Sequence, residues 1–243
     1  MRVKRKTWMT AGLLAGLTLL AGCWTVRGRG GAVLSEAEKQ AMAQEIAGLR
    51  ARADRGDAPA ARRLGEIYAS GEAGDFDYPA ALKYSRQAAE GGEPEGYYQL
   101  ALLYLYGDGV EQSYPEAVRY LELANTPSAW NALGVIAQQG YRGEADLAAA
   151  AEWYRRAAEA GLPVAQCNYA ACLFSGSGVA ADRGAAMEWF EKAWRNGDST
   201  AGEWLGMIYL KGLGVPVDRG KAQEYLQCSG TELEELARRP VNN

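Results

Sequence analysis

The sequence predicts an all-α protein: a right-handed α-solenoid of about five helix-turn-helix repeats with capping helices at its ends. Three observations predict this fold. Landmark residues recur every 33 or 36 positions, apolar residues follow helical spacing, and capping residues precede the expected helices. The chain has 243 residues, 48% hydrophobic and 23% charged, a composition typical of a folded protein. The repeats are expected in residues 57–230.

The first 23 residues predict a secretory signal. A basic start is followed by an apolar stretch over residues 8–20, shorter than the roughly 20 residues that span a bilayer. The stretch ends in Leu-Ala-Gly-Cys, which resembles the lipobox of bacterial lipoproteins, where the peptide is cleaved before the cysteine and the thiol receives diacylglycerol. The resemblance implies lipid attachment at Cys23. Because Trp24 replaces the aspartate that favours inner-membrane retention, it also implies an outer-membrane location facing the periplasm. The alternative is an ordinary signal peptide in which Cys23 is incidental.

A tether and a capping helix are expected next. Residues 24–34 contain Gly28, Gly30 and Gly31 and predict a flexible connection. Ser35 and Glu38 form a capping box that opens an N-terminal capping helix within residues 35–56. Its tail, DRGDAPAARRLG, aligns with RNGDSTAGEWLG later in the chain, so this segment resembles half a repeat. A terminal element of this kind covers a core face that lacks a neighbour.

Each repeat is marked by three residues in constant phase. A small residue is followed by a glycine six positions later and by an aromatic residue nineteen positions later. The small residues are Gly65, Ala101, Gly134, Ala170 and Gly206; the glycines are Gly71, Gly107, Gly140, Gly176 and Gly212; the aromatics are Tyr84, Tyr120, Trp153, Trp189 and Tyr225. Apolar residues at i, i+3 and i+4 on both sides of the glycine predict two helices. The small residue allows neighbouring helices to approach closely.

Capping residues place the starts of these helices. Pro94, Pro127 and Pro163 suit the first position of the first helix, where proline loses no helical hydrogen bond. The second helices are expected to begin at side chains that accept hydrogen bonds from free backbone N–H groups. These are Asp77, Ser113, Asp146, Asp182 and Asp218. The functional alternative is a row of acidic metal ligands or catalytic acids.

Two further features complete the predicted architecture. The stretch between Tyr120 and Gly134 is three residues shorter than its equivalents, so a bend in the stack is expected there. Thr231 and Glu234 form a second capping box, which predicts a C-terminal capping helix and tail over residues 231–243.

Three stretches carry a family resemblance: YLYGDGVEQSYPEAVRYLELA, LFSGSGVAADRGAAMEWFEKA and IYLKGLGVPVDRGKAQEYLQ. They resemble Sel1-like repeats, relatives of tetratricopeptide repeats, and the resemblance runs from about Asp57 to Ser229. Two loops depart from the pattern. Ala73 replaces the second glycine of the first loop, and the third loop, around Tyr141, lacks the G-x-G-V form. These two loops are expected to deviate from the family geometry.

Composition argues against several function classes. The absence of histidine removes His-based triads, His metal ligands and the commonest general base. Without the four basic residues of the first 23 positions, 22 basic and 30 acidic residues remain, a net charge of 22 − 30 = −8. This acidity argues against binding to nucleic acid. The G-x-G loops lack a third glycine and a preceding strand, so no nucleotide cofactor is expected. No S-x-x-K or G-x-S-x-G motif occurs, and we predict neither an enzyme nor a metal site.

The remaining cysteines permit more than one interpretation. Cys172 occupies a core position and is interpreted as a small buried hydrophobe. Cys167 lies five residues away on another face of the same helix, so the two cannot easily bridge. Cys228 falls in a position that looks exposed. A bridge between Cys167 and Cys228 is conceivable, and the sequence leaves it open.

The tetratricopeptide relation implies a binding groove lined by the first helices. The positions three before and one, four and five after each small residue would face it. The predicted partner-binding residues are Arg62, Glu66, Tyr98, Leu102, Leu105, Tyr106, Asn131, Val135, Gln138, Phe174, Met207 and Leu210. Their apolar members would form an exposed stripe, which usually marks a binding surface. The alternative is that curvature buries the stripe between neighbouring repeats.

The resemblance implies a binding function in the bacterial envelope. We expect a protein partner and a membrane contact through the lipid anchor, with no nucleic acid, metal or cofactor. One hypothesis is an adaptor or regulator of envelope machinery. A second is an immunity protein that neutralises a secreted toxic enzyme such as a phospholipase effector. A third, suggested by cysteine-rich Sel1-like proteins proposed to handle β-lactams, is an enzyme acting on those compounds.

Overall fold

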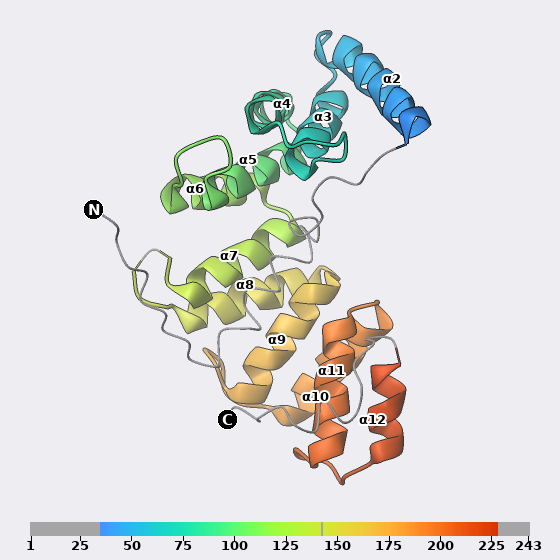
Figure 1. The fold of residues 1–243 in the computed structure, drawn as a ribbon. Helices are drawn as coiled ribbons and strands as arrows, with labels where there is room; N and C mark the ends of the chain where they lie inside the picture. The colour runs from blue at the N-terminus through green and yellow to red at the C-terminus, as the bar shows by residue number, and fades with distance from the viewer. Residues whose placement is uncertain (1–34, 142, 228–243) are drawn as a thin grey trace, which may run out of the picture.

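The computed structural model describes residues 35–141 and 143–227, which form eleven α-helices stacked in chain order (Figure 1). The helices are α2 (Glu36–Ala53), α3 (Ala58–Ser70), α4 (Tyr78–Glu90), α5 (Pro94–Tyr106), α6 (Tyr114–Ala124), α7 (Pro127–Gln139), α8 (Leu147–Glu159), α9 (Pro163–Ser175), α10 (Arg183–Arg195), α11 (Ser199–Lys211) and α12 (Arg219–Leu226). Helix α2 packs on α3, and the other ten form five pairs, one for each predicted repeat. The predicted all-α, paired-helix stack is confirmed.

The small residue of each first helix gives the paired helix room to approach. A methyl group added to Gly134 would lie 2.6 Å from the ring of Tyr154 on α8. The same addition to Gly206 would lie 2.9 Å from Leu226 on α12. Both distances are shorter than carbon–carbon van der Waals contact, so larger side chains would push the paired helices apart.

The predicted caps are also confirmed. The five second helices, α4, α6, α8, α10 and α12, each follow a cap side chain that accepts a hydrogen bond from the backbone N–H three residues on, at 2.9–3.4 Å. Ser35 and Glu38 form both bonds of a capping box at the start of α2. Pro94, Pro127 and Pro163 are the first residues of α5, α7 and α9. The capping box predicted at Thr231, together with Cys23 and Cys228, lies outside the described residues.

The second glycine of the G-x-G loops packs against the preceding repeat. Gly109 lies against Tyr78 at the start of α4, and Gly178 lies against Leu147 at the start of α8. Gly214 lies against Arg183 at the start of α10, where an added methyl group would still have 3.5 Å. All three glycines have positive φ, between 73° and 91°. The loop pattern therefore reflects both a left-handed backbone and a close contact between repeats.

The two loops that depart from the pattern have different neighbours. The first loop, with Ala73, follows α3, which is preceded by the single helix α2 and not by a complete repeat. In the third loop, Tyr141 stacks on Tyr114 at the start of α6, with ring centroids 4.7 Å apart. An aromatic stack thus replaces the close backbone contact at this place.

The shortened connection lies between α6 and α7. Helix α6 has 11 residues, whereas α4, α8 and α10 have 13 each. Asn125 ends α6 with φ 49°, the one positive value at a non-glycine position among the described residues. Only Asn125 and Thr126 separate α6 from α7. These two helices pack less extensively than any other consecutive pair in the described stack.

Within residues 35–141 and 143–227, no helix has both the length and the apolar character needed to cross a lipid bilayer.

Candidate functional site

Six of the predicted groove residues are core residues. Tyr98, Leu102, Leu105, Asn131, Val135 and Phe174 each have an exposed fraction of 8% or less. The prediction of a continuous exposed apolar stripe is therefore wrong, and the alternative of burial between repeats is correct for these positions.

The physical reason is that neighbouring helices, both the paired second helix and the first helix of the next repeat, cover these side chains. Tyr98, Leu102 and Leu105 of α5 pack in one cluster with Leu133 and Ile136 of α7. In the same way, Val135 of α7 packs with Cys172 of α9, and Phe174 of α9 packs with Ile208 of α11. Burying apolar surface between repeats is more favourable than leaving it in water, and it adds to the packing of each second helix on the following first helix.

Asn131 of α7 is also covered by the next repeat, but here the contact is made by a polar side chain. Its Oδ1 accepts a hydrogen bond of 2.9 Å from Nδ2 of Asn168 on α9, and both side chains are buried. This bond gives the Asn131 amide oxygen a donor and the Asn168 amide nitrogen an acceptor, groups that are costly to bury alone. Asn131 therefore connects two repeats.

Six predicted residues do reach the surface. Glu66 and Gln138 are exposed, while Arg62, Tyr106, Met207 and Leu210 are half-buried. We call these six residues the first-helix face. Gln138 accepts a hydrogen bond of 2.8 Å from the Tyr154 hydroxyl on α8. Whether this face binds a partner remains a prediction.

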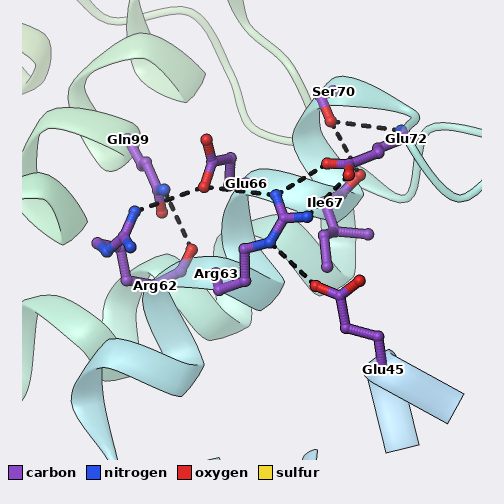
Figure 2. A network of polar contacts seen from close by, with 8 residues as sticks. All are labelled: Glu45, Arg62, Arg63, Glu66, Ile67, Ser70, Glu72 and Gln99. Carbon is purple, nitrogen blue, oxygen red and sulfur yellow. Dashed lines mark hydrogen bonds and ion pairs between the residues drawn. The ribbon is translucent and has the colours of Figure 1, made fainter. Parts of the chain in front are cut away.

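The first-helix face is charged at its N-terminal end, around α3 (Figure 2). Arg63 pairs with both carboxylate oxygens of Glu72 at 2.7 and 2.8 Å, and its Nε lies 3.2 Å from Glu45 on α2. These contacts connect the capping helix and the first loop to α3. Two-point Arg–carboxylate pairing fixes geometry better than a single contact. Arg63 is therefore a structural residue beside the face.

Glu66 lies between Arg62 and Arg63 of α3 (Figure 2), and its Oε2 lies 3.7 Å from Nη1 of Arg63. Nη1 of Arg62 lies 3.4 Å from Oε2 of Glu66. The backbone oxygen of Arg62 accepts a 3.2 Å hydrogen bond from Gln99 on α5, and Gln99 in turn accepts one from Ser85 at 3.0 Å. This chain of bonds fixes α3 against α5 and holds the backbone that carries Arg62.

Glu95 adds a third charge to this end of the face. Burial raises the pKa of the Glu95 carboxyl, the Arg62 charge lowers it, and the Glu66 charge raises it. Among the described residues, Glu95 has no side-chain hydrogen bond and no ion pair within 4.0 Å. We call Arg62, Glu66 and Glu95 the charged cluster. Glu66 contacts the guanidinium groups of both Arg62 and Arg63. Glu95, in contrast, is half-buried and has no close partner among the described residues.

Sequence reasoning did not identify Glu95. It directly follows Pro94, and an acidic residue in the first turn of a helix has an ordinary explanation in the helix dipole. The signal that could have found it is its packing beside Arg62 of the previous repeat, which only the arrangement of α3 and α5 reveals.

The two described internal cysteines are buried free thiols. Burial raises the pKa of Cys172 to about 11, which agrees with its interpretation as a small core residue. Burial also raises the pKa of Cys167, and the thiol donates a hydrogen bond to Asp198. Cys167 lines no surface, although its position belongs to the predicted groove. Residues 35–141 and 143–227 contain no group of three or more His, Cys, Asp or Glu arranged to hold a metal ion.

The family model described as Sel1 repeat matches five stretches: residues 58–93, 94–125, 127–162, 163–198 and 203–231. Together they make up more than half of the chain and coincide with the five helix pairs. Sel1 repeats typically mediate protein–protein interactions. A comparison with curated proteins found no match.

Several solved structures are similar. A protective antigen of uropathogenic Escherichia coli with an SLR fold is 33% identical, with a TM-score of 0.68, over 76% of this chain and 40% of that one. A Sel1 repeat protein from Oxalobacter formigenes is 34% identical, with a TM-score of 0.69, over 76% of this chain and 55% of that one. This chain thus spans about half the length of these two proteins.

An immunity protein from Pseudomonas aeruginosa shares the fold at 14% identity and a TM-score of 0.56, over 93% of this chain and 83% of that one. At this identity the likeness concerns the fold alone. The five matched stretches and the five observed helix pairs lead to one conclusion: the chain belongs to the Sel1 repeat family.

Proposed function

We propose that this chain is a periplasm-facing lipoprotein of the outer membrane that binds a protein partner through its first-helix face. In this role it acts as an adaptor or regulator of envelope machinery and has no catalysis of its own. The family supports the binding function, since Sel1 repeats typically mediate protein–protein interactions.

The observation that carries the proposal is the charged cluster. Glu95 is a half-buried carboxylate whose pKa is raised by burial, and it has no hydrogen-bonded partner in the described structure. Leaving such a group without a donor is costly, whereas a donor supplied by a partner would relieve that cost. The neighbouring Glu66 and Arg62 add charges that such a partner can recognise.

The lipoprotein part of the proposal is supported by the N-terminal sequence. The apolar stretch ends in Leu-Ala-Gly-Cys, and Trp24 follows Cys23 in place of an aspartate. The glycine-containing residues 24–34 would connect the anchor to the folded repeats. The absence of histidine and of serine-nucleophile motifs supports a binding role over an enzymatic one.

The experiment is a crosslinking pull-down of the tagged, full-length chain from intact bacterial cells, with the recovered proteins identified by mass spectrometry. The test variant is Glu66→Gln with Glu95→Gln, which removes two charges of the cluster and preserves side-chain size. The matched control is Glu90→Gln with Glu188→Gln, which changes two exposed glutamates on α4 and α10 by the same net charge.

We expect the test variant to recover about tenfold less partner than the natural chain, since charge-assisted hydrogen bonds contribute about 1.5 to 3 kcal/mol each. The control variant should recover as much partner as the natural chain. Several resident envelope proteins that are lost with the test variant would support the adaptor role. Equal recovery by both variants would overturn the assignment of binding to this face.

A second candidate function, an immunity protein, is favoured by charge. Residues 24–243 carry 22 basic and 30 acidic residues, a net charge of −8, which would attract a basic toxin and speed its association. The same pull-down separates the candidates, because an immunity protein would recover a single secreted enzyme. Substrate turnover by the purified chain in place of a protein partner would instead support an enzyme.

A further inference from the structure

A pocket of about 370 Å³ is lined by residues of α6, α7 and α8 and of the loop before α8. Helices α6, α7 and α8 follow one another in the middle of the stack (Figure 1). None of its lining residues belongs to the first-helix face or to the charged cluster. The residues that matter for its chemistry are Val118 and Glu122 on α6, Ile136 on α7, Glu144 and Asp146 before α8, and Trp153 on α8.

The inner part of the pocket is apolar and aromatic. Val118 and Ile136 are core residues, and Trp153 is half-buried against the same cluster. Arg156 does not line the pocket: its guanidinium lies 4.0 Å from the ring centre of Trp130 and 5.8 Å from that of Trp153. Arg156 also donates a 3.2 Å hydrogen bond to Asn125.

The rim of the pocket is acidic. Glu122, Glu144 and Asp146 are all exposed, and no lysine or arginine of residues 35–141 and 143–227 lines the pocket. Asp146 uses one oxygen to cap α8, accepting from the backbone N–H of Ala149 at 2.9 Å. Glu122 and Glu144 form no ion pair and no side-chain hydrogen bond with any residue in the described part of the chain. The carboxylates of Glu122 and Glu144 are therefore available to a ligand in a pocket that Trp153 also lines.

We propose that this pocket binds the side chain of an arginine from a partner protein. The aliphatic part of arginine would pack against Val118 and Ile136, which are apolar. Its planar guanidinium would stack on Trp153, a geometry that arginine adopts on aromatic faces. The head group would lie within reach of Glu122 and Glu144, whose charges are otherwise unneutralised by the described residues.

Arginine fits this arrangement better than a purely apolar or acidic side chain does. An apolar side chain would leave the carboxylates of Glu122 and Glu144 without a cation. An acidic side chain would be repelled by Glu122, Glu144 and Asp146 together. The net charge of −8 for residues 24–243 adds long-range attraction for a basic partner segment. The inference goes beyond the proposed function because it assigns a second, separate surface.

The test uses the purified full-length chain in non-ionic detergent, with ¹⁵N-labelled tryptophan indoles observed by NMR. The probe is the peptide acetyl-Gly-Leu-Arg-Leu-Gly-amide, and the control peptide has citrulline in place of arginine, which keeps the shape but removes the charge. Comparison with a Trp153→Phe variant assigns the Trp153 indole signal.

We expect the arginine peptide to shift the Trp153 signal in a saturable way and to bind about tenfold more tightly than the citrulline peptide. Glu122→Gln with Glu144→Gln should weaken the arginine peptide by about the same factor. Ala149→Leu, which fills the pocket without changing its charge, should also weaken it. The Glu90→Gln, Glu188→Gln control should bind the peptide as the natural chain does.

No shift of the Trp153 signal, equal affinity for the two peptides, or unchanged affinity in the Glu122→Gln, Glu144→Gln variant would overturn the inference. The Glu66→Gln, Glu95→Gln variant separates the two surfaces, because it should bind the arginine peptide normally. The pull-down with the Glu66→Gln, Glu95→Gln variant therefore tests the first-helix face alone. The titration with the arginine peptide tests the pocket alone.

Discussion

At the scale of single residues, Glu95 shows how neighbouring helices change the pKa of a side chain. On α5 alone it is an acidic residue in a first turn, where the helix dipole favours negative charge. Packing of α5 beside α3 removes part of its water and places it near Arg62 and Glu66. Burial has the largest effect, so the charged form of Glu95 is disfavoured in the folded protein.

The raised pKa of Glu95 predicts a pH-dependent stability effect. The folded protein keeps the Glu95 carboxyl protonated at pH values where the unfolded chain, with the ordinary pKa of 4.5, has lost the proton. The free energy of unfolding therefore falls as pH rises from 4.5 through the raised pKa of Glu95. Glu95→Gln does not titrate, so it should not show this fall. Urea unfolding at several pH values should therefore show the variant gaining stability over the natural chain as pH rises to neutral. The exposed Glu188→Gln variant should track the natural chain, and parallel profiles for Glu95→Gln would contradict the prediction.

At the scale of the helix pairs, the loop glycines connect neighbouring repeats. Gly178 has φ 73°, and a methyl group added to it would overlap the backbone oxygen of Leu147 at the start of α8. Gly161 has φ 93° but open space around it. The two positions therefore share the backbone requirement and differ in the contact between repeats.

Replacing these glycines with alanine should separate the two effects. Gly161→Ala is expected to lower the free energy of unfolding by about 1 kcal/mol, the cost of a left-handed backbone with a Cβ. Gly178→Ala should lower it by about 3 kcal/mol, because the methyl group also displaces the loop from α8. Urea denaturation measures both. Equal losses would mean that the contact between repeats contributes nothing at Gly178.

At the scale of the whole molecule, the stack is built from contacts between neighbours. Apolar side chains of the first helices are buried between repeats, whereas the charged cluster at α3, the half-buried residues of the first-helix face and the pocket beside α6 remain accessible. The proposed anchor at Cys23 would hold these surfaces near the membrane.

Anchoring predicts a defined labelling result. Cells that express the full-length chain and take up an alkyne-labelled fatty acid should incorporate it into the natural protein, and Cys23→Ala should abolish incorporation because no other thiol lies in a lipobox. Cys228→Ala is the matched control and should remain labelled. Detection of the label after gel separation measures the outcome, and persistent labelling of Cys23→Ala would exclude lipidation at this residue.

The sequence by itself determined the helix pairs and their ends. Caps such as Asp182, prolines such as Pro163 and the small residues such as Gly134 act over a few positions of chain, so their effects can be read from spacing. The shortened connection after Tyr120 was visible in the same way. Local hydrogen bonding and helical period are sufficient for this level of structure.

Only the tertiary structure decided which side chains remain accessible. Tyr98, Leu102 and Phe174 have the spacing of a groove, yet the paired second helix and the next first helix cover them. Glu95 and the pocket at Trp153 arise from residues of different helices. The helical period assigns a residue to a face of its own helix. The distance and angle between neighbouring repeats determine whether that face meets water or another helix, because burial depends on contacts far apart in the chain.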